Sequence, residues 1–484
     1  MLFNSIAFLL FFSVVVLLYF ALRHRYRWLL LLLASCVFYA AFIPSYLLIL
    51  FSLILVDYTS AIFIEKSSGK YRKRWLLISI ISTCTILFVF KYFNFFSFNA
   101  GRIATLLHWQ YAPPLLKILL PIGLSFHTFQ SLSYVVEVYH GKQKAEKHLG
   151  IYTLYVMFFP QLVAGPIERP QNLLHQFREP HNLNYDDIST GLRQMLYGYF
   201  KKMVIADNLA PYVDIVYRHP AGTTGNMTIV AVIFFAIQIY CDFSGYSDIA
   251  LGAARIMGFR LMTNFSFPYF SHSIAVFWRR WHISLSTWFR DYVFIPLGGS
   301  RVSKLRTWYN LFLVFLLSAL WHGAGWTFVI WGLLHAVYLI LSDVVSPSSR
   351  FPTLGASRLY NWLSILVTFT LTSFAWIFFR AASVPNALAV IHQLSFHPAT
   401  FITDSLLLAN KVHMADAERV PLLYVLVSLF FFTISEVYLY KKPSFVIRTL
   451  AYRPIRWAVY YTAIVCIFFL GVYDVTPNFI YFQF

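Results

Sequence analysis

The fold of this chain is decided by the stretch Ser318-Ala-Leu-Trp-His-Gly-Ala-Gly-Trp-Thr-Phe-Val-Ile-Trp-Gly-Leu-Leu-His335. It lies within an uncharged run from Leu311 to Leu341, which is long enough to contain membrane helices. His322 stands inside this run, beside Gly323 and Gly325, which are expected to loosen the helix and let a substrate approach the backbone. An ionisable side chain within a membrane segment is costly to bury and is therefore a candidate functional residue. The stretch predicts a membrane protein with a histidine site inside the bilayer.

Apolar composition extends this prediction to the whole chain. Of its 484 residues, 59% are hydrophobic and only 12% are charged, about half the charged fraction of a soluble domain. A spanning helix needs roughly 20 apolar residues, so we predict an all-α polytopic membrane protein with about ten to twelve membrane helices, some of them re-entrant or interfacial. Besides the run around His322, the uncharged stretches are Ile6–Leu22, Trp28–Val56, Trp75–Phe90, Ile118–Val136, Leu149–Ile167, Leu359–Phe379 and Trp457–Tyr473.

The formal charge of +19 is distributed as in a membrane protein. Basic residues gather in short loops, the pattern that orients helices with their basic loops in the cytoplasm and that attracts anionic lipid. This distribution favours a lipid membrane over nucleic acid as the partner, and it places the N-terminus outside. The basic clusters are Arg23–Arg27, Lys66–Arg74, Lys142–Lys147, Lys201–Lys202 and Lys441–Lys442.

No repeat or flexible linker divides the chain, so we expect a single membrane domain over residues 1–484. The polar block Ile167–Tyr217 has an amphipathic second half, which predicts a helix along the cytoplasmic surface. From Asp242 to Arg306, polar turns alternate with aromatic residues. Irregular backbone at membrane depth must be buried in protein or line a watery cavity, so this block predicts the wall of a central tunnel.

Two histidines are the candidates for proton transfer. His322 can accept and return a proton near neutral pH, although a histidine can also serve as hydrogen-bonded packing between helices. His282 lies in a polar, aromatic segment beside Arg279 and Arg280. These arginines suit a phosphate or carboxylate, while the alternative is an interfacial helix whose arginines reach the lipid headgroups.

Other ionisable residues favour structural roles. His335 would lie on a different face from His322 if the helix were continuous. His127 lies in a membrane run with small and hydroxyl residues, which favours helix packing. Asp242 and Asp248, around Gly245, are expected to be residues of a polar turn or members of a small polar network. Neither these residues nor the four scattered cysteines have metal-ligand spacing, so no metal site is expected.

The chain resembles the membrane-bound O-acyltransferases in three segments: Trp281-His-Ile-Ser-Leu-Ser-Thr-Trp-Phe-Arg-Asp-Tyr292, Ile295-Pro-Leu-Gly-Gly299 and Leu320-Trp-His-Gly-Ala-Gly-Trp326. Three more segments resemble the bacterial alginate O-acetyltransferase branch of that family: Tyr240-Cys-Asp-Phe-Ser-Gly-Tyr-Ser-Asp248, Phe159-Pro-Gln-Leu-Val-Ala-Gly-Pro-Ile167 and Phe479-Ile-Tyr-Phe-Gln-Phe484. The resemblance runs nearly end to end, with a core motif region at 240–335.

The resemblance implies a helical fold around a tunnel that an acyl thioester enters from the cytoplasm. Its hallmark histidine corresponds to His322 and its second motif histidine to His282. The acyl group would be passed across the bacterial inner membrane to a periplasmic partner similar to SGNH hydrolases, which modifies an exported polysaccharide. The implied donor is acetyl-CoA, or an acyl carrier thioester as in the teichoic-acid relatives, and no permanently bound cofactor is expected. Arg279 and Arg280 are candidates for binding the donor's phosphates.

The C-terminal tail 479–484 carries a further resemblance. Phe479-Ile-Tyr-Phe482 is similar to the F-x-Y-F ending of the small accessory peptide of teichoic-acid D-alanylation systems. The resemblance implies that Tyr481 relays the acyl group, with His322 as its general base. A phenol has an ordinary pKa of about 10, so its deprotonation needs assistance. The alternative is an aromatic anchor at the membrane interface.

Several functions remain open at this point. Within the enzymes, the alternatives are O-acetylation of peptidoglycan or of another exopolysaccharide, and D-alanyl transfer to teichoic acid. A transporter or flippase of lipid-linked sugars is a different class, but the segments around His282 and His322 have no second copy in the other half of the chain. A purely scaffolding subunit of a polysaccharide secretion complex is a third alternative, but it would not explain why histidines are buried in apolar segments.

Overall fold

All regular secondary structure in the described residues of the computed structural model is helical, which confirms the predicted all-α class. By its contacts it divides into two compact units: unit 1 comprises Met1–Gln194 and Ala250–Thr263, and unit 2 comprises Met195–Ile249 and Asn264–Phe484. The structure describes residues 1–111, 113–118, 120–121, 123–162, 165–345, 357–415, 420–473 and 480.

Seven helices in the described ranges are long and apolar enough to cross a membrane, and the apolar helix Ile6–Ala21 is somewhat shorter. The polytopic membrane character is therefore confirmed, while the total of ten to twelve membrane segments stays a prediction. The seven candidate spans are Tyr46–Lys66, Gly69–Leu106, Gly225–Ile256, Trp326–Val344, Arg358–Arg380, Leu422–Lys441 and Arg453–Leu470.

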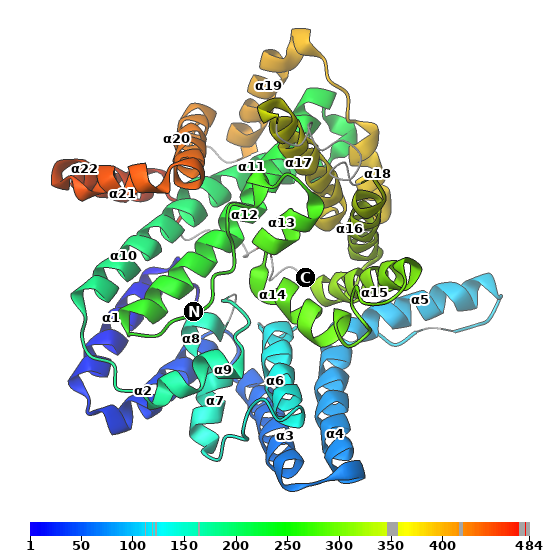
Figure 1. Ribbon diagram of the computed structural model, residues 1–484. Helices are drawn as coiled ribbons and strands as arrows, with labels where there is room; N and C mark the ends of the chain where they lie inside the picture. The colour runs from blue at the N-terminus through cyan, green and yellow to red at the C-terminus, as the bar shows by residue number, and fades with distance from the viewer. Residues whose placement is uncertain are drawn as a thin grey trace. The chain divides into compact units, whose positions relative to one another are not determined.

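Unit 1 is built around three mutually packed helices, α3, α4 and α6, while α2 packs against α7 (Figure 1). Its helices are α1 (Ile6–Ala21), α2 (His24–Ala40), α3 (Tyr46–Lys66), α4 (Gly69–Leu87), α5 (Phe93–Leu106), α6 (Leu124–Tyr139), α7 (Leu149–Met157), α8 (Phe159–Leu162) and α9 (Pro170–Leu173). The amphipathic helix α10 (Tyr185–Tyr199) begins in unit 1 and leads into the π-helical turn η3 (Phe200–Ala206) of unit 2.

Unit 2 contains the predicted motif residues. Within it α15 packs against α16, and α16 packs against α17. Its helices are α11 (Asp207–Arg218), most of α12 (Gly225–Ile256), α13 (Ile274–Arg280), α14 (Ile283–Phe289), α15 (Lys304–His322), α16 (Trp326–Val345), α17 (Arg358–Arg380), α18 (Val384–His392), α19 (Phe401–Ala415), α20 (Leu422–Lys441), α21 (Pro443–Ala451) and α22 (Arg453–Leu470).

The expectation of a polar turn at Asp242–Asp248 is wrong, because these residues lie inside the 32-residue helix α12. Gly245 lies against η3 and the end of α10, and a Cβ atom at this position would be only 2.7 Å from the carbonyl oxygen of Gly198. The two glycines therefore permit a backbone approach that larger residues would block. The acidic residues are tolerated in a helix because lysines pair with them, as described below.

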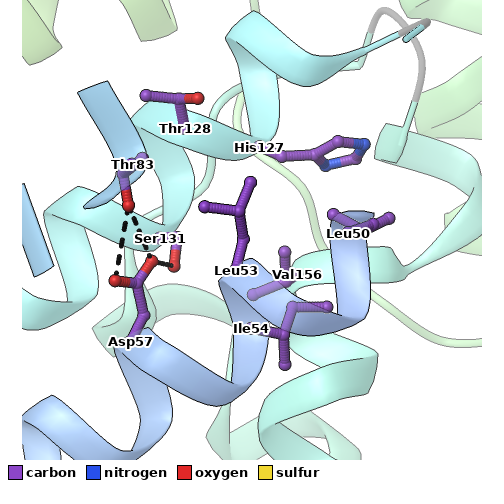
Figure 2. A pocket seen from close by; sticks show the side chains of 9 residues that line it. All are labelled: Leu50, Leu53, Ile54, Asp57, Thr83, His127, Thr128, Ser131 and Val156. Carbon is purple, nitrogen blue, oxygen red and sulfur yellow. Dashed lines mark hydrogen bonds between the residues drawn. The ribbon is translucent and has the colours of Figure 1, made fainter. Parts of the chain in front are cut away.

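A polar cluster lies at the centre of unit 1 (Figure 2). Asp57 on α3 is fully buried and accepts hydrogen bonds from Ser79 on α4, at 2.6 Å, and from Ser131 on α6. The hydroxyl of Thr83 lies 3.5 Å from both carboxylate oxygens, and the hydroxyl of Tyr152 lies 2.8 Å from that of Ser131. The carboxylate thus links three apolar helices through their hydroxyl groups.

The same cluster borders a small cavity that is also lined by His127 and Thr128 of α6 (Figure 2). His127 is buried, and its ring lies 6.0 Å from that of Tyr39. The packing role predicted for His127 stays a prediction. Hydroxyls that converge on one carboxylate satisfy a charge that would otherwise be expensive at this depth.

Replacing Asp57 by Ala is expected to destabilise unit 1. The cost is about 1–3 kcal/mol for each hydroxyl left without an acceptor, measured as a lower midpoint of thermal unfolding in detergent. Adding Ser79→Ala and Ser131→Ala should restore part of the loss, because both unsatisfied donors are then removed. A triple variant that is even less stable than Asp57→Ala would contradict this account of the cluster.

Candidate functional site

His322 is the last residue of α15 and is only 4% exposed. Its Nδ1 lies 2.7 Å from the backbone carbonyl oxygen of Ser318, one turn earlier. A carbonyl can only accept a hydrogen bond, so Nδ1 must carry the proton. In the neutral imidazole the lone pair is then on Nε2, which is the arrangement that a general base requires.

The glycines after His322 produce a complete helix break rather than a loosened helix. Gly323 caps α15 in an extended conformation, and α16 begins at Trp326. A Cβ atom at Gly323 would lie 2.2 Å from the ring of Phe328, so no other residue fits this position without displacement of that ring. The uncharged run around His322 is therefore a pair of packed helices, with the histidine at their connection.

His282 is fully buried and occupies an unusual backbone conformation. It precedes α14 with φ 44° and ψ 56°, the left-handed region that residues other than glycine seldom adopt. Such conformations carry a cost in free energy, and they gather at functional sites where the surrounding contacts impose them. The strain supports the prediction that this residue has a specific task.

Asn264 supplies the contacts that hold His282. Its side-chain oxygen lies 3.1 Å from Nδ1 of His282 and accepts a hydrogen bond from the hydroxyl of Ser284 at 2.9 Å. Its backbone carbonyl also accepts the amide of Ile283 at 2.9 Å. Because the amide oxygen is an acceptor, Nδ1 of His282 carries the proton. Asn264 is not among the residues predicted from the sequence, where its only signal is its place in a polar turn between aromatic residues.

Aromatic rings connect the two histidines. The ring of Trp321 lies 6.0 Å from that of His282 and 4.9 Å from that of His322, measured between centroids. Trp331 lies on α16 with its ring 4.7 Å from that of His322. Burial lowers the pKa of His282 well below its ordinary value, and the nearby imidazole of His322 acts in the same direction. His282 is therefore neutral in this setting.

The helix break also brings His335 into this aromatic cluster. Its ring lies 5.3 Å from that of Trp331, which contacts His322 as well. The indole of Trp278 donates a hydrogen bond to Nδ1 of His335 at 3.2 Å. A continuous helix would have separated the two histidines, whereas the break folds α16 back along α15. The structural role predicted for His335 stays a prediction.

The two candidate phosphate-binding arginines lie at the end of α13. Arg279 is exposed. Arg280 is half-buried and donates to the carbonyl oxygen of Phe270 at 3.2 Å, and its guanidinium lies 5.3 Å from the ring centroid of Tyr440. Arg280 is thus directed towards an aromatic wall formed by the loop before α13 and the end of α20. Donor binding by either arginine stays a prediction.

A buried ion cluster replaces the exposed basic loop predicted at Lys201–Lys202. Lys202 is 2% exposed, and its Nζ lies 2.7 Å from Asp207 and 2.6 Å from Asp242. Lys201 is also buried and pairs with Asp248. Burial by itself lowers the pKa of Lys202, but the carboxylates of Asp207 and Asp242 outweigh it and raise the pKa above its ordinary value. The lysines leave the surface because carboxylates elsewhere in the fold compensate their charge.

Asp242 also binds the C-terminal part of the chain. Its Oδ2 accepts the backbone amide of Ile480 at 2.8 Å, and Ile480 is 5% exposed in the core of unit 2. The side-chain amide of Asn208 donates to the carbonyl oxygen of Leu470, at the end of α22. The candidate relay Tyr481 lies outside the described residues, as does the rest of the tail 479–484 except Ile480.

A metal site is not formed by the residues that the structure describes, since no three or more His, Cys, Asp or Glu side chains group together suitably. The two imidazoles of the histidine cluster are groups that can perform acid–base chemistry. A neutral imidazole with its lone pair on Nε2 is held among aromatic rings, and a second neutral imidazole is fixed by an amide oxygen.

Comparison with known protein families decides the identity. The sequence model of the membrane-bound O-acyltransferase family matches residues 16–383. The chain belongs to this family. It is accordingly an O-acyltransferase, and the predicted resemblance is confirmed.

Relatives within the O-acyltransferase family differ in the polymer that they are named for. The chain is 38% identical over 441 residues to the probable alginate O-acetylase AlgI of Pseudomonas aeruginosa, with 90% of this chain and 82% of the relative covered. It is 36% identical over 388 residues to the peptidoglycan O-acetyltransferase of Helicobacter pylori, covering 75% and 72%. It is 29% identical over 272 residues to the teichoic acid D-alanyltransferase of Bacillus subtilis, covering 53% and 68%. The alginate branch resemblance is thereby confirmed.

Asn264 offers a test of how this O-acyltransferase uses His282. We expect Asn264→Ala to lower the rate of acyl transfer, because the Nδ1 proton of His282 loses its acceptor. Asn264→Asp keeps an acceptor but adds a negative charge, which favours the protonated imidazole and raises the pKa of His282. On acidification, Asn264→Asp should therefore lose activity at a higher pH than the wild-type protein does.

The measurement is acyl transfer by purified protein in detergent between pH 5 and pH 8, with thermal unfolding as a check on folding. A merely structural Asn264 would change the unfolding midpoint and leave the shape of the profile unaltered. That outcome would remove His282 from the proton-transfer chemistry.

Proposed function

We propose that this O-acyltransferase passes an acetyl group from a cytoplasmic thioester across the bacterial inner membrane, for O-acetylation of an exported polysaccharide such as alginate. The observation that carries the proposal is the hydrogen bond from Nδ1 of His322 to the carbonyl oxygen of Ser318, which places the lone pair of this buried imidazole on Nε2. The alginate O-acetylases among its relatives support the choice of polymer.

The chemistry assigned to His322 is general base catalysis. Its Nε2 takes the proton from the attacking hydroxyl, the hydroxyl oxygen forms a bond to the thioester carbonyl carbon, and the carbon–sulfur bond breaks. The proton then passes from the imidazolium to the departing thiolate, so the step is balanced. His282 is assigned to support or position the donor or the acceptor, because it shares the aromatic cluster of His322.

The attacking hydroxyl in this proposal is the phenol of Tyr481. The tail reaches the core of unit 2 at Ile480, whose amide is bound by Asp242, and Tyr481 is the next residue in the chain. The acetylated tyrosine would then deliver its acyl group to a periplasmic partner similar to SGNH hydrolases, which modifies the polysaccharide. The donor is acetyl-CoA or an acyl carrier thioester, with Arg279 and Arg280 as candidates for its phosphates, and no cofactor is permanently bound.

Peptidoglycan and teichoic acid are alternative final acceptors. The relative from Helicobacter pylori is named for peptidoglycan and the one from Bacillus subtilis for teichoic acid. The alginate assignment is favoured by the higher identity and larger coverage of the alginate O-acetylases. Family membership argues against the transporter or flippase alternative.

His322→Ala is expected to abolish most of the ester-linked acetate on one exported polymer, with a rate loss of about 10²- to 10⁴-fold from the missing base. The measurement is ester-linked acetate on alginate, peptidoglycan and other exported polysaccharides, at matched abundance of the protein in the membrane. His413→Ala, an exposed histidine on α19, is the matched control and should retain acetylation. Unchanged acetate on every polymer in His322→Ala would refute the base assignment, and the polymer that loses acetate names the acceptor.

Tyr481→Phe tests the relay separately from the base. The variant keeps the aromatic ring but lacks the hydroxyl that would carry the acetyl group, so polymer acetate should be lost while binding of the donor persists. Tyr473→Phe is the matched control, because the hydroxyl of Tyr473 donates a hydrogen bond to the carbonyl oxygen of Ile467 on α22. Full acetylation by Tyr481→Phe would leave the tail as an interfacial anchor.

A further inference from the structure

Unit 2 contains a cavity that is separate from the histidine cluster. It has a volume of about 510 Å³ and lies where the start of α17, the end of α20 and the loop before α13 meet. Three of its lining residues, Arg358, Asn361 and Trp362, follow one another at helical spacing on one face of α17, and Ile365 continues that face. Tyr440 and Lys441 line it from α20.

The cavity combines positive charge with aromatic walls. His272, Arg358 and Lys441 line it, and among the described lining residues none is acidic. The described part of the chain contains no carboxylate that forms an ion pair with Arg358 or Lys441. Nζ of Lys441 instead lies 4.1 Å from the ring centroid of Trp362. Within the described residues, the charges of Arg358 and Lys441 are therefore not balanced by a carboxylate.

The opposite wall is fixed by stacking. The rings of Phe270 and Tyr440 lie 4.9 Å apart and are nearly parallel, at 9°. The guanidinium of Arg280 packs on Tyr440 and donates to the carbonyl oxygen of Phe270, which adds a third positive charge beside the cavity. The cavity is thus a preformed space with an excess of basic groups, as an anionic ligand requires.

The surroundings of the cavity are those of a membrane interface. Leu359, Leu363 and Leu366 on α17 are exposed apolar residues next to the lining face, and α17 is one of the candidate membrane spans. Lys441 and Lys442 end the candidate span α20, where the charge distribution places the cytoplasmic side. Basic pockets between membrane helices on that side suit phosphate-bearing lipid headgroups.

We propose that this cavity binds the headgroup of an anionic phospholipid from the cytoplasmic leaflet. The phosphate diester is held by Arg358 and Lys441, the aromatic residues Trp362 and Tyr440 lie at the level of the headgroup, and the acyl chains run along the exposed leucines of α17. This lipid site does not involve His322, whereas Arg280, a candidate for the donor's phosphates, lies beside its aromatic wall.

The position of the cavity along α17 separates it from the histidine cluster. Phe379, near the other end of α17, has its ring 5.6 Å from that of His322. Asn361 precedes Phe379 by 18 residues on the same helix, a rise of about 27 Å. A lipid bound at the cavity would therefore leave His322 unobstructed. The phosphates of a soluble thioester donor share the same chemistry, and the test distinguishes the two sources.

The experiment is native mass spectrometry of the full chain, released from nanodiscs that contain equal amounts of phosphatidylglycerol and phosphatidylcholine. We expect retention of phosphatidylglycerol on the wild-type protein. The double variant Arg358→Gln/Lys441→Gln should bind it more weakly, on the order of fivefold for each charge removed. The matched control Lys304→Gln/Arg306→Gln, with two exposed basic residues on α15, should bind as wild type does.

Folding and ligand source are controlled in the same experiment. The charge-preserving variant Arg358→Lys/Lys441→Arg should keep its lipid, and thermal unfolding in neutral detergent checks that each variant is folded. Equal retention of the two lipids, or unchanged phosphatidylglycerol binding in the double Gln variant, would overturn the proposal. A third result would also overturn the proposal: millimolar coenzyme A removes the bound lipid from the protein, and the protein shows no preference for phosphatidylglycerol. That result would assign the cavity to the donor. None of these outcomes depends on turnover, so they are independent of His322.

Discussion

The constraint on which the structure depends is the high cost of a polar or charged group in an apolar interior without a partner. In unit 2 the ion pairs of Lys202 with Asp207 and Asp242 show how it is met. They allow a lysine to leave the surface and acidic residues to occupy the middle of a long apolar helix. They also leave one oxygen of Asp242 to bind the amide of Ile480. A single cluster therefore connects η3, α11, α12 and the C-terminal part of the chain.

The same constraint determines the chemistry of the histidine cluster. Each imidazole has one nitrogen bound by a protein group, and that bond decides which nitrogen keeps a lone pair. Ser318 holds the Nδ1 proton of His322, while Asn264 holds that of His282. The rings of Trp321 and Trp331 pack beside His322. The hydrogen bond to Ser318, one helical turn away, thus fixes which nitrogen of His322 is available to the proposed general base chemistry.

The charges of the cationic cavity at the start of α17 are arranged differently. Its charges have no acidic partners among the described lining residues, and they lie where the exposed surface changes from apolar to basic. Basic side chains without an acidic partner are tolerated at a membrane interface because lipid phosphates are abundant there. Within unit 2, paired charges thus stabilise the fold and the tail, whereas the unpaired ones are available to a ligand.

Much of the site was predictable from local sequence. His322 was identified because an ionisable residue in an uncharged run has few structural explanations, and the glycines that follow it predicted the local disturbance. Asp57 shows the limit of that signal, since it directly follows the run Trp28–Val56 and yet lies fully buried at the centre of unit 1. A single charge at the edge of an apolar run is ambiguous until its partners are known, and these come from α4 and α6.

The sequence by itself determined the helical membrane class, the family and the candidate histidines, because apolar length, charge distribution and short motifs are local properties. Only the tertiary structure decided that Lys201 and Lys202 are buried, that Asn264 orients His282, that α12 continues through its acidic residues, and that the helix break brings His335 near His322. Each of these depends on a partner far away in the chain. The free energy of a buried polar group is set by that partner, and no local pattern reveals which one it will be.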